Sequence, residues 1–277
     1  MIKLYIILLS IILSFTTVYF SFDYSLLPTI FLYIGFFFIY IIGFVLLFFI
    51  LWGLLVFTVN KNKPHSYSRY YRFVMQLLNI VGLSLFNIKV KYSGKEIVDN
   101  LHSNFLLICN HQSNLDSVVA DYYLQNHKLL FIGKKSLFKI PFVGKTISGI
   151  GYLPLDRNDL RQEAKIVKDA TKILSTNDVS IGIYPEGTRN QKKDATISEL
   201  KAGSFHLALD SRKPIVISLI TYDKDITSNI FKIRHCKYKI VKAITYDEYK
   251  NYSSKELAIY VHDIMQEEMN KLYEQKN

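Results

Sequence analysis

One short loop of the sequence combines residue types that could transfer a proton. The stretch from Asn110 to Asp116 reads NHQSNLD, so His111 and Asp116 lie five positions apart. On an ideal helix, five steps of about 100° leave two side chains roughly 140° apart. The pair can therefore touch only if His111 precedes a helix whose first turn holds Asp116. Ser113 and Asn114 are natural N-cap residues for that arrangement.

The pairing of His111 with Asp116 would create a general base. In the geometry just described, the carboxylate accepts a hydrogen bond from Nδ1–H of the imidazole. This leaves Nε2 free to take up a proton. The alternative is a solvated loop histidine beside a capping aspartate. Spacing alone does not separate these two interpretations.

A second loop, from Tyr184 to Asn190, offers a group that could bind an anion. It reads YPEGTRN, in which Pro185 and Gly187 are typical of a tight turn. The guanidinium of Arg189 is a planar fork of donors that suits a phosphate. The simpler interpretation makes Arg189 a turn residue in a surface ion pair.

Two other features are less informative by themselves. The stretch GYLPLDR, from Gly151 to Arg157, places Asp156 and Arg157 after a short apolar run, where an arginine can equally be solvated. His206 could reach the site, but a histidine that packs between helices is the simpler interpretation.

The chain after residue 87 alternates short apolar runs with helical patterns, which predicts an α/β sheet. Functional side chains in such sheets collect in loops just beyond the carboxyl ends of strands. The candidate strands are Ile88 to Tyr92, Phe105 to Cys109, Leu129 to Ile132, Val179 to Tyr184, Ile215 to Ile220 and Lys239 to Ile244.

Helices are expected at two places in this region. Apolar spacing predicts a helix over residues 160–174, with Asn158 or Asp159 available as its N-cap. The last element is predicted over residues 254–274, where the opening residues have capping-box spacing.

The N-terminal region is predicted to be a membrane anchor. Leu4 to Phe22 is a run of 19 uncharged residues, close to the ~20 that a helix needs to cross the hydrocarbon core. Leu26 to Val59 is a second run of 34 residues, which as one helix must tilt or lie partly in the interface. We expect a hairpin of two apolar helices over residues 1–60.

Charges at the ends of these runs predict the orientation of the anchor. Lys3 precedes the first run, Lys61 and Lys63 follow the second, and only Asp23 lies between them. The positive-inside rule then places both outer flanks, and so the following domain, on the cytoplasmic side of the cell membrane. A cleaved signal peptide is disfavoured, because no small-x-small site precedes Asp23.

The segment between the anchor and the α/β region, residues 61–87, is predicted to be an interfacial amphipathic linker helix. Its tyrosines and arginines would lie at the level of the headgroups. The side chains expected to point inward are Val74, Leu77, Leu78 and Val81.

Charge and cysteine content narrow the possible partners. The formal net charge of +11 falls entirely on residues 61–277, which suits a surface of anionic lipid headgroups. Nucleic acid is the other usual partner of a basic domain, but an apolar anchor argues against it. Cys109 and Cys236 are too few for a disulfide framework, show no metal-ligand spacing, and are expected to be buried.

In combination and in this order, the blocks resemble the glycerolipid acyltransferase family, particularly its bacterial 1-acylglycerol-3-phosphate acyltransferases. Asn110 to Asp116 is similar to the His-x-x-x-x-Asp block, Gly151 to Arg157 to the second block, and Tyr184 to Asn190 to the Glu-Gly-Thr-Arg block. KKSLFKIPFVG, from Lys134, and LKAGSFHLA, from Leu200, resemble further segments of the family. The resemblance runs from about residue 88 to residue 245.

This resemblance implies a mixed β-sheet flanked by helices over residues 88–277, and an enzyme that makes phosphatidic acid. His111 would deprotonate the free hydroxyl of a lysophospholipid such as lysophosphatidic acid, and Asp116 would orient the imidazole. An acyl thioester of coenzyme A or of acyl carrier protein would be the co-substrate, with no metal or organic cofactor. The implied substrate-binding residues are Lys134, Arg157, Glu186, Gly187, Thr188 and Arg189.

Departures from the family pattern leave the choice of acceptor open. Ser136 replaces a usual Glu, and Ile217 replaces a usual second Pro. Glycerol 3-phosphate or a lysophospholipid with a larger headgroup is an alternative acceptor. A non-catalytic lipid-binding protein and a hydrolase are alternatives of other classes, and the sequence contains no Gly-x-Ser-x-Gly nucleophile motif that would favour the hydrolase.

Overall fold

The structure is a computed structural model that describes residues 2–21, 26–60, 67–156, 158–176, 178–190, 194–223 and 232–274. The chain divides into two compact units, Met1–Val59 and Asn60–Asn277. Each unit is described by itself below.

The first unit is a pair of apolar helices, α1 (Ile2–Ser21) and α2 (Leu26–Leu55). Between them, the hydroxyls of Thr17 and Tyr40 form a hydrogen bond of 2.6 Å, and the rings of Phe15 and Tyr33 stack with centroids 5.7 Å apart. The predicted hairpin is therefore confirmed.

Both helices are long and apolar enough to cross a membrane. The second is one continuous helix of 30 residues, about 45 Å in length, and it ends four residues before the predicted Val59. Most of the large side chains of the pair are apolar and exposed. These properties fit association of the chain with a membrane.

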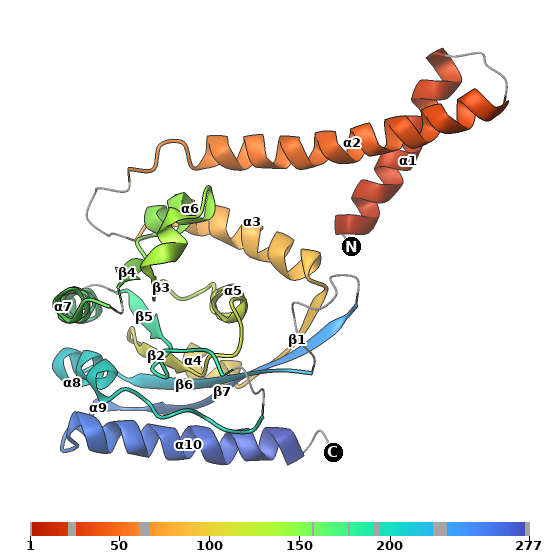
Figure 1. Cartoon of the computed structure of the whole chain (residues 1–277). Coiled ribbons are helices and arrows are strands. Elements are labelled where there is room, and N and C mark those ends of the chain that lie inside the picture. Colours follow the sequence, from red (N-terminus) through yellow and green to blue (C-terminus); the bar gives the residue numbers. More distant parts are fainter. Residues whose placement is uncertain are drawn as a thin grey trace. The chain divides into compact units, whose positions relative to one another are not determined.

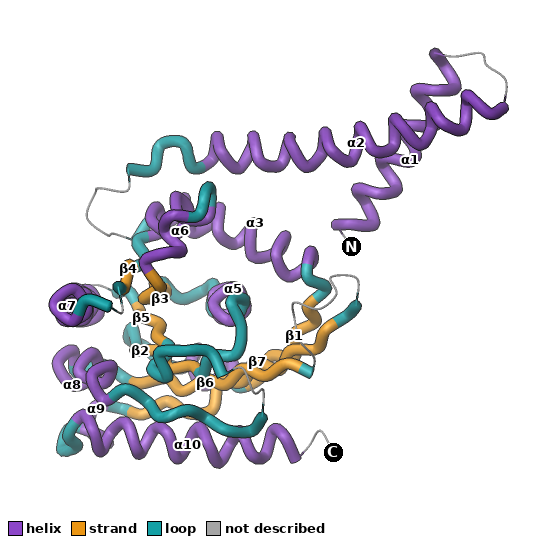
Figure 2. The backbone as a smooth tube through the Cα atoms, viewed as in Figure 1, coloured by secondary structure: helices purple, strands orange, loops and turns teal. Residues whose placement is uncertain are grey.

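The second unit is built on a seven-stranded mixed sheet (Figures 1 and 2). The strand order is β1-β7-β6-β2-β5-β3-β4, and all neighbours are parallel except β6 and β7. The central strands β2, β5 and β6 are buried along their whole length, as expected for strands covered on both faces. The strands are β1 (Ile88–Ser93), β2 (Leu106–Cys109), β3 (Leu129–Lys134), β4 (Leu153–Leu155), β5 (Ser180–Ile183), β6 (Ile215–Tyr222) and β7 (Arg234–Ile244).

Six of these strands were predicted, with small differences at their ends, and the seventh was not. The strand β4 has only three residues and contains Pro154, and both properties weaken a strand signal. The strand β7 begins at Arg234, five residues before the predicted start. The prediction missed these residues because polar residues alternate with buried ones along the strand.

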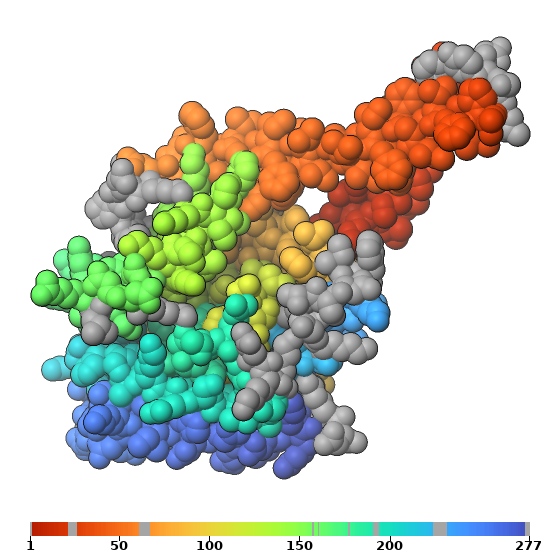
Figure 3. Space-filling view, viewed as in Figure 1, coloured from red at the N-terminus to blue at the C-terminus, as the bar shows by residue number. Residues whose placement is uncertain are grey.

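Helices cover both faces of the sheet. Figure 1 shows α10 along one face and α3 and α5 on the other, and the space-filling view shows α10 as a continuous blue layer (Figure 3). The helices of this unit are α3 (Arg69–Leu85), α4 (Lys95–Asp99), α5 (Asp116–Tyr123), α6 (Val143–Ile150), α7 (Leu160–Thr176), α8 (His206–Ser211), α9 (Tyr246–Tyr249) and α10 (Ser254–Glu274), with 3₁₀ turns η1 (Lys135–Lys139) and η2 (Ala202–Phe205).

The predicted helices α7 and α10 are confirmed, together with their caps. The carboxylate of Asp159 accepts from the backbone N–H groups of Arg161 and Gln162, which satisfies donors at the start of α7. Ser253 and Glu256 bond to each other's backbone N–H at the start of α10, as a capping box does.

The helix α3 forms where the linker helix was expected, but its inward face differs from the prediction. Its buried residues include Val74, Met75 and Arg72, whereas Leu77 is exposed. The helix packs against α5 and α6 in the second unit. Arg72 is buried, because a buried carboxylate in α5 holds its guanidinium, whereas a contact with headgroups would require an exposed side chain.

That carboxylate belongs to Asp121, which is fully buried. It forms an ion pair with Arg72, and it accepts hydrogen bonds from Asn79 Nδ2 (2.7 Å), Gln76 Nε2 (3.0 Å) and the Tyr152 hydroxyl (3.1 Å). Burial raises the pKa of Asp121, while the Arg72 charge opposes that rise. The cluster of polar groups therefore joins α3 to α5 inside an apolar core.

We predict that Arg72→Met costs about 3–5 kcal/mol of unfolding free energy at neutral pH, because it leaves the carboxylate of Asp121 buried and uncompensated. Adding Asp121→Asn to this variant should recover most of the loss. Without Arg72 the pKa of Asp121 rises further, so the cost of the single substitution should shrink at acidic pH, where the carboxyl is neutral. Urea melts of the two variants at pH 5 and pH 8 provide the measurement, and equal losses at both pH values would contradict it.

Candidate active site

The order of the strands explains why loops distant in sequence meet at one edge of the sheet. The strands β6, β2, β5 and β3 are consecutive neighbours and all parallel, so their carboxyl ends lie together. Ile108 near the end of β2 pairs in register with Ile183 at the end of β5. The His111 loop and the Arg189 loop follow directly from these two strands. The two loops therefore lie side by side, as predicted, because of the order of the strands in the sheet.

Within the first loop, His111 Nδ1 lies 2.8 Å from Asp116 Oδ2. The helix α5 begins at Asp116, so the histidine precedes the helix and the aspartate lies in its first turn, as the five-residue spacing required. The N-cap, however, is Leu115 and not Ser113 or Asn114. Capping by those side chains is unnecessary, because the Asp116 carboxylate itself holds the turn.

The carboxylate of Asp116 is fully buried and well supplied with donors. Its Oδ2 accepts from the backbone N–H groups of Gln112 (2.7 Å) and Ser113 (2.8 Å) as well as from the imidazole. Its Oδ1 accepts from the hydroxyl of Tyr222 at 2.8 Å. Burial raises the pKa of Tyr222 well above its usual value, so this hydroxyl remains a donor at neutral pH. Such a site holds a carboxylate in its charged form.

The hydrogen bond to Asp116 fixes the tautomer of His111, with the proton on Nδ1. No residue in the described part of the chain bonds to Nε2. One face of the imidazole stacks on the ring of Tyr184, with centroids 4.4 Å apart. The side chain is 17% exposed. The free nitrogen is therefore available to a molecule that enters the site.

His111 lines a cavity of about 430 Å³. The cavity combines His111 with three predicted binding residues, Lys134, Thr188 and Arg189, whose side chains are exposed. The remaining wall is largely apolar and includes Met75, Val118, Phe131, Leu137, Val143 and Ile147. The lining thus offers cationic and hydrogen-bonding groups for an anion together with an apolar wall for hydrocarbon.

Glu186 and Gly187 lie in the same loop but do not line this cavity. Glu186 is 7% exposed, and its carboxylate accepts from the backbone N–H groups of His111 (2.7 Å) and Ser198 (3.2 Å). Burial raises the pKa of Glu186, and the hydrogen bond from His111 opposes that rise. Gly187 has φ +72°, and an added Cβ would lie 2.7 Å from Lys201 Cε. Both residues therefore shape the loop. Arg157 lies outside the described residues.

Two contributors to the site were absent from the sequence prediction. Tyr222 was missed because the strand that contains it was expected to end at Ile220, two residues too early. The other is Asn110, whose side-chain amide accepts from Ile220 N–H (2.7 Å) and donates to the Ile220 carbonyl (2.9 Å). That bond pair fastens the end of β2 to β6. The position of Asn110 directly after a buried strand was the feature of the sequence that could have predicted this role.

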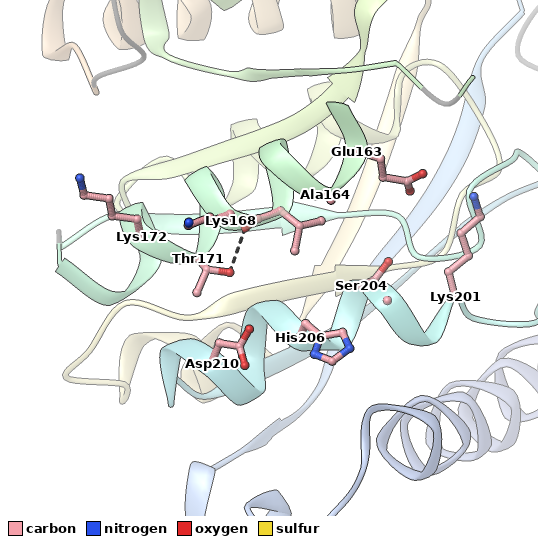
Figure 4. Close-up of a pocket in the computed structure, with 11 residues that line it drawn as sticks. Glu163, Ala164, Lys168, Thr171, Lys172, Lys201, Ser204, His206 and Asp210 are labelled. Carbon is pink, nitrogen blue, oxygen red and sulfur yellow. Dashed lines mark hydrogen bonds between the residues drawn. The ribbon is translucent and has the colours of Figure 1, made fainter. Parts of the chain in front are cut away.

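A larger groove of about 860 Å³ lies elsewhere, between α7 and α8 (Figure 4). His206 lines this groove with an exposed side chain, so it is not buried by helix packing. It does not line the cavity that contains His111. Lys168 and Lys172 line it together with Glu163 and Asp210, so its charges are mixed. Among the described residues, no group of three or more His, Cys, Asp or Glu side chains could hold a metal ion.

Comparisons with known proteins identify the family of the chain. A family model described as Acyltransferase matches residues 89–221. The 1-acyl-sn-glycerol-3-phosphate acyltransferase of Haemophilus influenzae is 30% identical over 69% of this chain and 78% of its own length. The enzyme of that name from Escherichia coli is 28% identical over 68% of this chain and 76% of its own length.

The fold also matches a solved structure. The crystal structure of the 1-acyl-sn-glycerophosphate acyltransferase from Thermotoga maritima superposes with a TM-score of 0.58 at 19% identity, over 74% of this chain and 80% of that one. With a matching family model, similar relatives and this fold in agreement, the chain belongs to the acyltransferase family and is an acyltransferase.

Proposed function

We propose that the protein transfers a fatty acyl group from a thioester to the free hydroxyl of 1-acylglycerol-3-phosphate. The observation that carries this proposal is the His111–Asp116 pair, which opens onto a cavity that also contains Arg189 and Lys134. A base, a site for a phosphate and an apolar wall are what this acceptor needs. The names of the relatives support the same substrate.

The chemistry requires one proton relay. His111 Nε2 removes the proton from the acceptor hydroxyl as its oxygen attacks the thioester carbonyl carbon. The carbon–sulfur bond then breaks, and the imidazolium returns the proton to the departing thiolate. Asp116 holds the imidazole in place and stabilises its charged form, and assistance of this kind is worth roughly 100- to 10,000-fold.

The acceptor phosphate is assigned to the polar side chains that line the cavity. Arg189 offers a fork of donors, and Lys134 adds a point charge from the end of β3. Thr188 lies beside them, and the resemblance to the family adds Arg157. Glu186 and Gly187 contribute indirectly, because they hold the loop that carries both His111 and Arg189.

The donor and the cellular setting complete the proposal. Coenzyme A or acyl carrier protein supplies the leaving thiol, so the reaction as written needs no metal or organic cofactor. The product would be phosphatidic acid, an intermediate of phospholipid synthesis. The positive charges beside the apolar helices support a catalytic unit on the cytoplasmic side of the cell membrane.

Purified protein in lipid or detergent, given a panel of acceptors and donors, tests this function. Thiol release should be fastest with lysophosphatidic acid, slower with glycerol 3-phosphate, and slow with lysophospholipids of larger headgroup. A preference for one of the other acceptors would keep the chemistry and replace the substrate. Thiol release without any acceptor would indicate a hydrolase.

We predict that His111→Ala lowers kcat by at least about 100-fold, because it removes the proposed general base at the reacting hydroxyl. The matched control is His206→Ala, in the separate groove, which should retain the activity of the parent. Melting temperatures of both variants should stay close to the parent value. Near-normal turnover of His111→Ala would refute the mechanism.

Arg189→Lys should raise the acceptor KM while leaving kcat within a few-fold, since a point charge replaces a planar fork. Arg161→Lys, on the exposed surface of α7, is the matched control. Initial rates at varied acceptor and fixed donor give both constants. An unchanged KM would place the phosphate elsewhere.

Glu186→Gln should lower both kcat and the melting temperature. An amide has one acceptor oxygen where the carboxylate has two, so either His111 N–H or Ser198 N–H loses its partner. Glu163→Gln, whose side chain has no such bonds among the described residues, is the control. If Glu186→Gln instead raises only the acceptor KM, Glu186 binds the acceptor directly.

A further inference from the structure

A column of aromatic rings supports the catalytic imidazole from beneath. The ring of Tyr184 stacks on His111 with a centroid distance of 4.4 Å and an interplanar angle of 27°. Tyr184 also stacks on Phe131 at 5.9 Å and 11°. The column therefore runs from β3 through the end of β5 to the loop after β2.

A glycine in β5 makes room for the base of this column. A Cβ built on Gly182 would lie 2.5 Å from Phe131 Cε1, which is closer than real Cβ atoms approach other atoms. Gly in the interior of a strand weakens the strand, so its presence marks a place where another group must come close. Here the group is the ring of Phe131. The ring of Tyr184 stacks on Phe131, and the imidazole of His111 stacks on Tyr184.

The hydroxyl of Tyr184 takes no part in this arrangement. It is buried, and no residue in the described part of the chain bonds to it. The hydroxyl is closed off from solvent, so a molecule in the cavity does not reach it in this structure. Any contribution of Tyr184 to the reaction must therefore come from its ring.

We propose that Tyr184 is a positioning residue for His111, and that its π face stabilises the imidazolium formed during acyl transfer. A cation within about 6 Å of a ring centroid and over its face is attracted by the ring quadrupole. Asp116 restrains the imidazole at its edge, and the ring restrains it at its face. The inference rests on the proposed general-base function of His111.

Other charged and titratable groups surround the imidazole, and they remain when Tyr184 is replaced. They come from α5, β6, the loop after β5 and β3, and they are Asp116, Tyr222, Glu186, Arg189 and Lys134. A difference in the pH–rate profile between variants at position 184 therefore reports the contribution of the ring alone.

The test compares Tyr184→Phe with Tyr184→Met across a pH–rate profile of kcat/KM. The phenylalanine variant keeps the ring and should stay within about twofold of the parent. The methionine variant fills the space without a π face, so kcat should fall roughly 10-fold or more, since small misplacements of reacting groups are costly. Its acid limb should move about half a pH unit lower, because the imidazolium has lost its cation–π partner.

Tyr92→Met is the matched control for loss of a packed ring. Tyr92 stacks on Tyr238 at 5.5 Å in β1 and β7, away from the site, and its hydroxyl also lacks a partner among the described residues. It should lower the melting temperature to a similar extent without moving the acid limb. An unmoved acid limb in Tyr184→Met, or a tenfold loss in Tyr184→Phe, would overturn the proposal.

A second experiment covers the case in which Tyr184→Met fails to fold. Phenylalanine with increasing numbers of fluorine atoms, incorporated at position 184, keeps the shape of the ring and weakens its quadrupole. The acid limb should then fall stepwise with fluorination, and a constant limb would reject the role of the π face. An NMR titration of the His111 imidazole in the same proteins needs no turnover. It therefore separates failure of this inference from failure of the proposed reaction.

Discussion

The carboxylate of Asp116 must be charged and buried at once, and this constraint organises the whole site. A buried charge is tolerated only when hydrogen bonds replace its lost hydration. Four donors do so here: the imidazole of His111, two backbone N–H groups of the loop, and the hydroxyl of Tyr222. The end of β2, the start of α5 and the end of β6 must therefore coincide within hydrogen-bond distance. The sheet between β6 and β2 makes that coincidence a property of the fold.

A second set of contacts fixes the partner loop to the first. The side chain of Glu186 bonds to the backbone of His111, and the His111 carbonyl accepts from Asn190 N–H at 2.8 Å. The loop that presents Arg189 is thus attached on both sides of that residue to the loop that presents the base. The strands β2 and β5 are adjacent and parallel, so residues about 75 positions apart in the sequence come close enough to form these bonds. The distance between the loops that carry His111 and Arg189 is set in this way.

Much of the site was predictable from the sequence, because strand–loop–helix patterns and the five-residue spacing of His111 and Asp116 are local features. Arg72 was expected at headgroup level and is buried, since its partner Asp121 lies 49 positions away on another helix. Tyr222 and Asn110 escaped notice for the same reason, because each acts through a contact across strands. The role of Gly182 also depends on a neighbouring strand. Sequence patterns identify the candidate catalytic residues, whereas the residues that hold them in place require tertiary contacts.

The burial of Cys109 has a chemical consequence for an enzyme that handles activated acyl groups. This thiol lies two positions before the base, in β2, and it is completely inaccessible. Burial raises the pKa of Cys109 well above its usual value, so the thiolate that could undergo thiol–thioester exchange is absent at neutral pH. An accessible cysteine at this position would compete with the acceptor and retain the fatty acid as a dead-end acyl-enzyme. With the proposed thioester donor, the closed packing of β2 would protect the enzyme from self-acylation as well as stabilise the core.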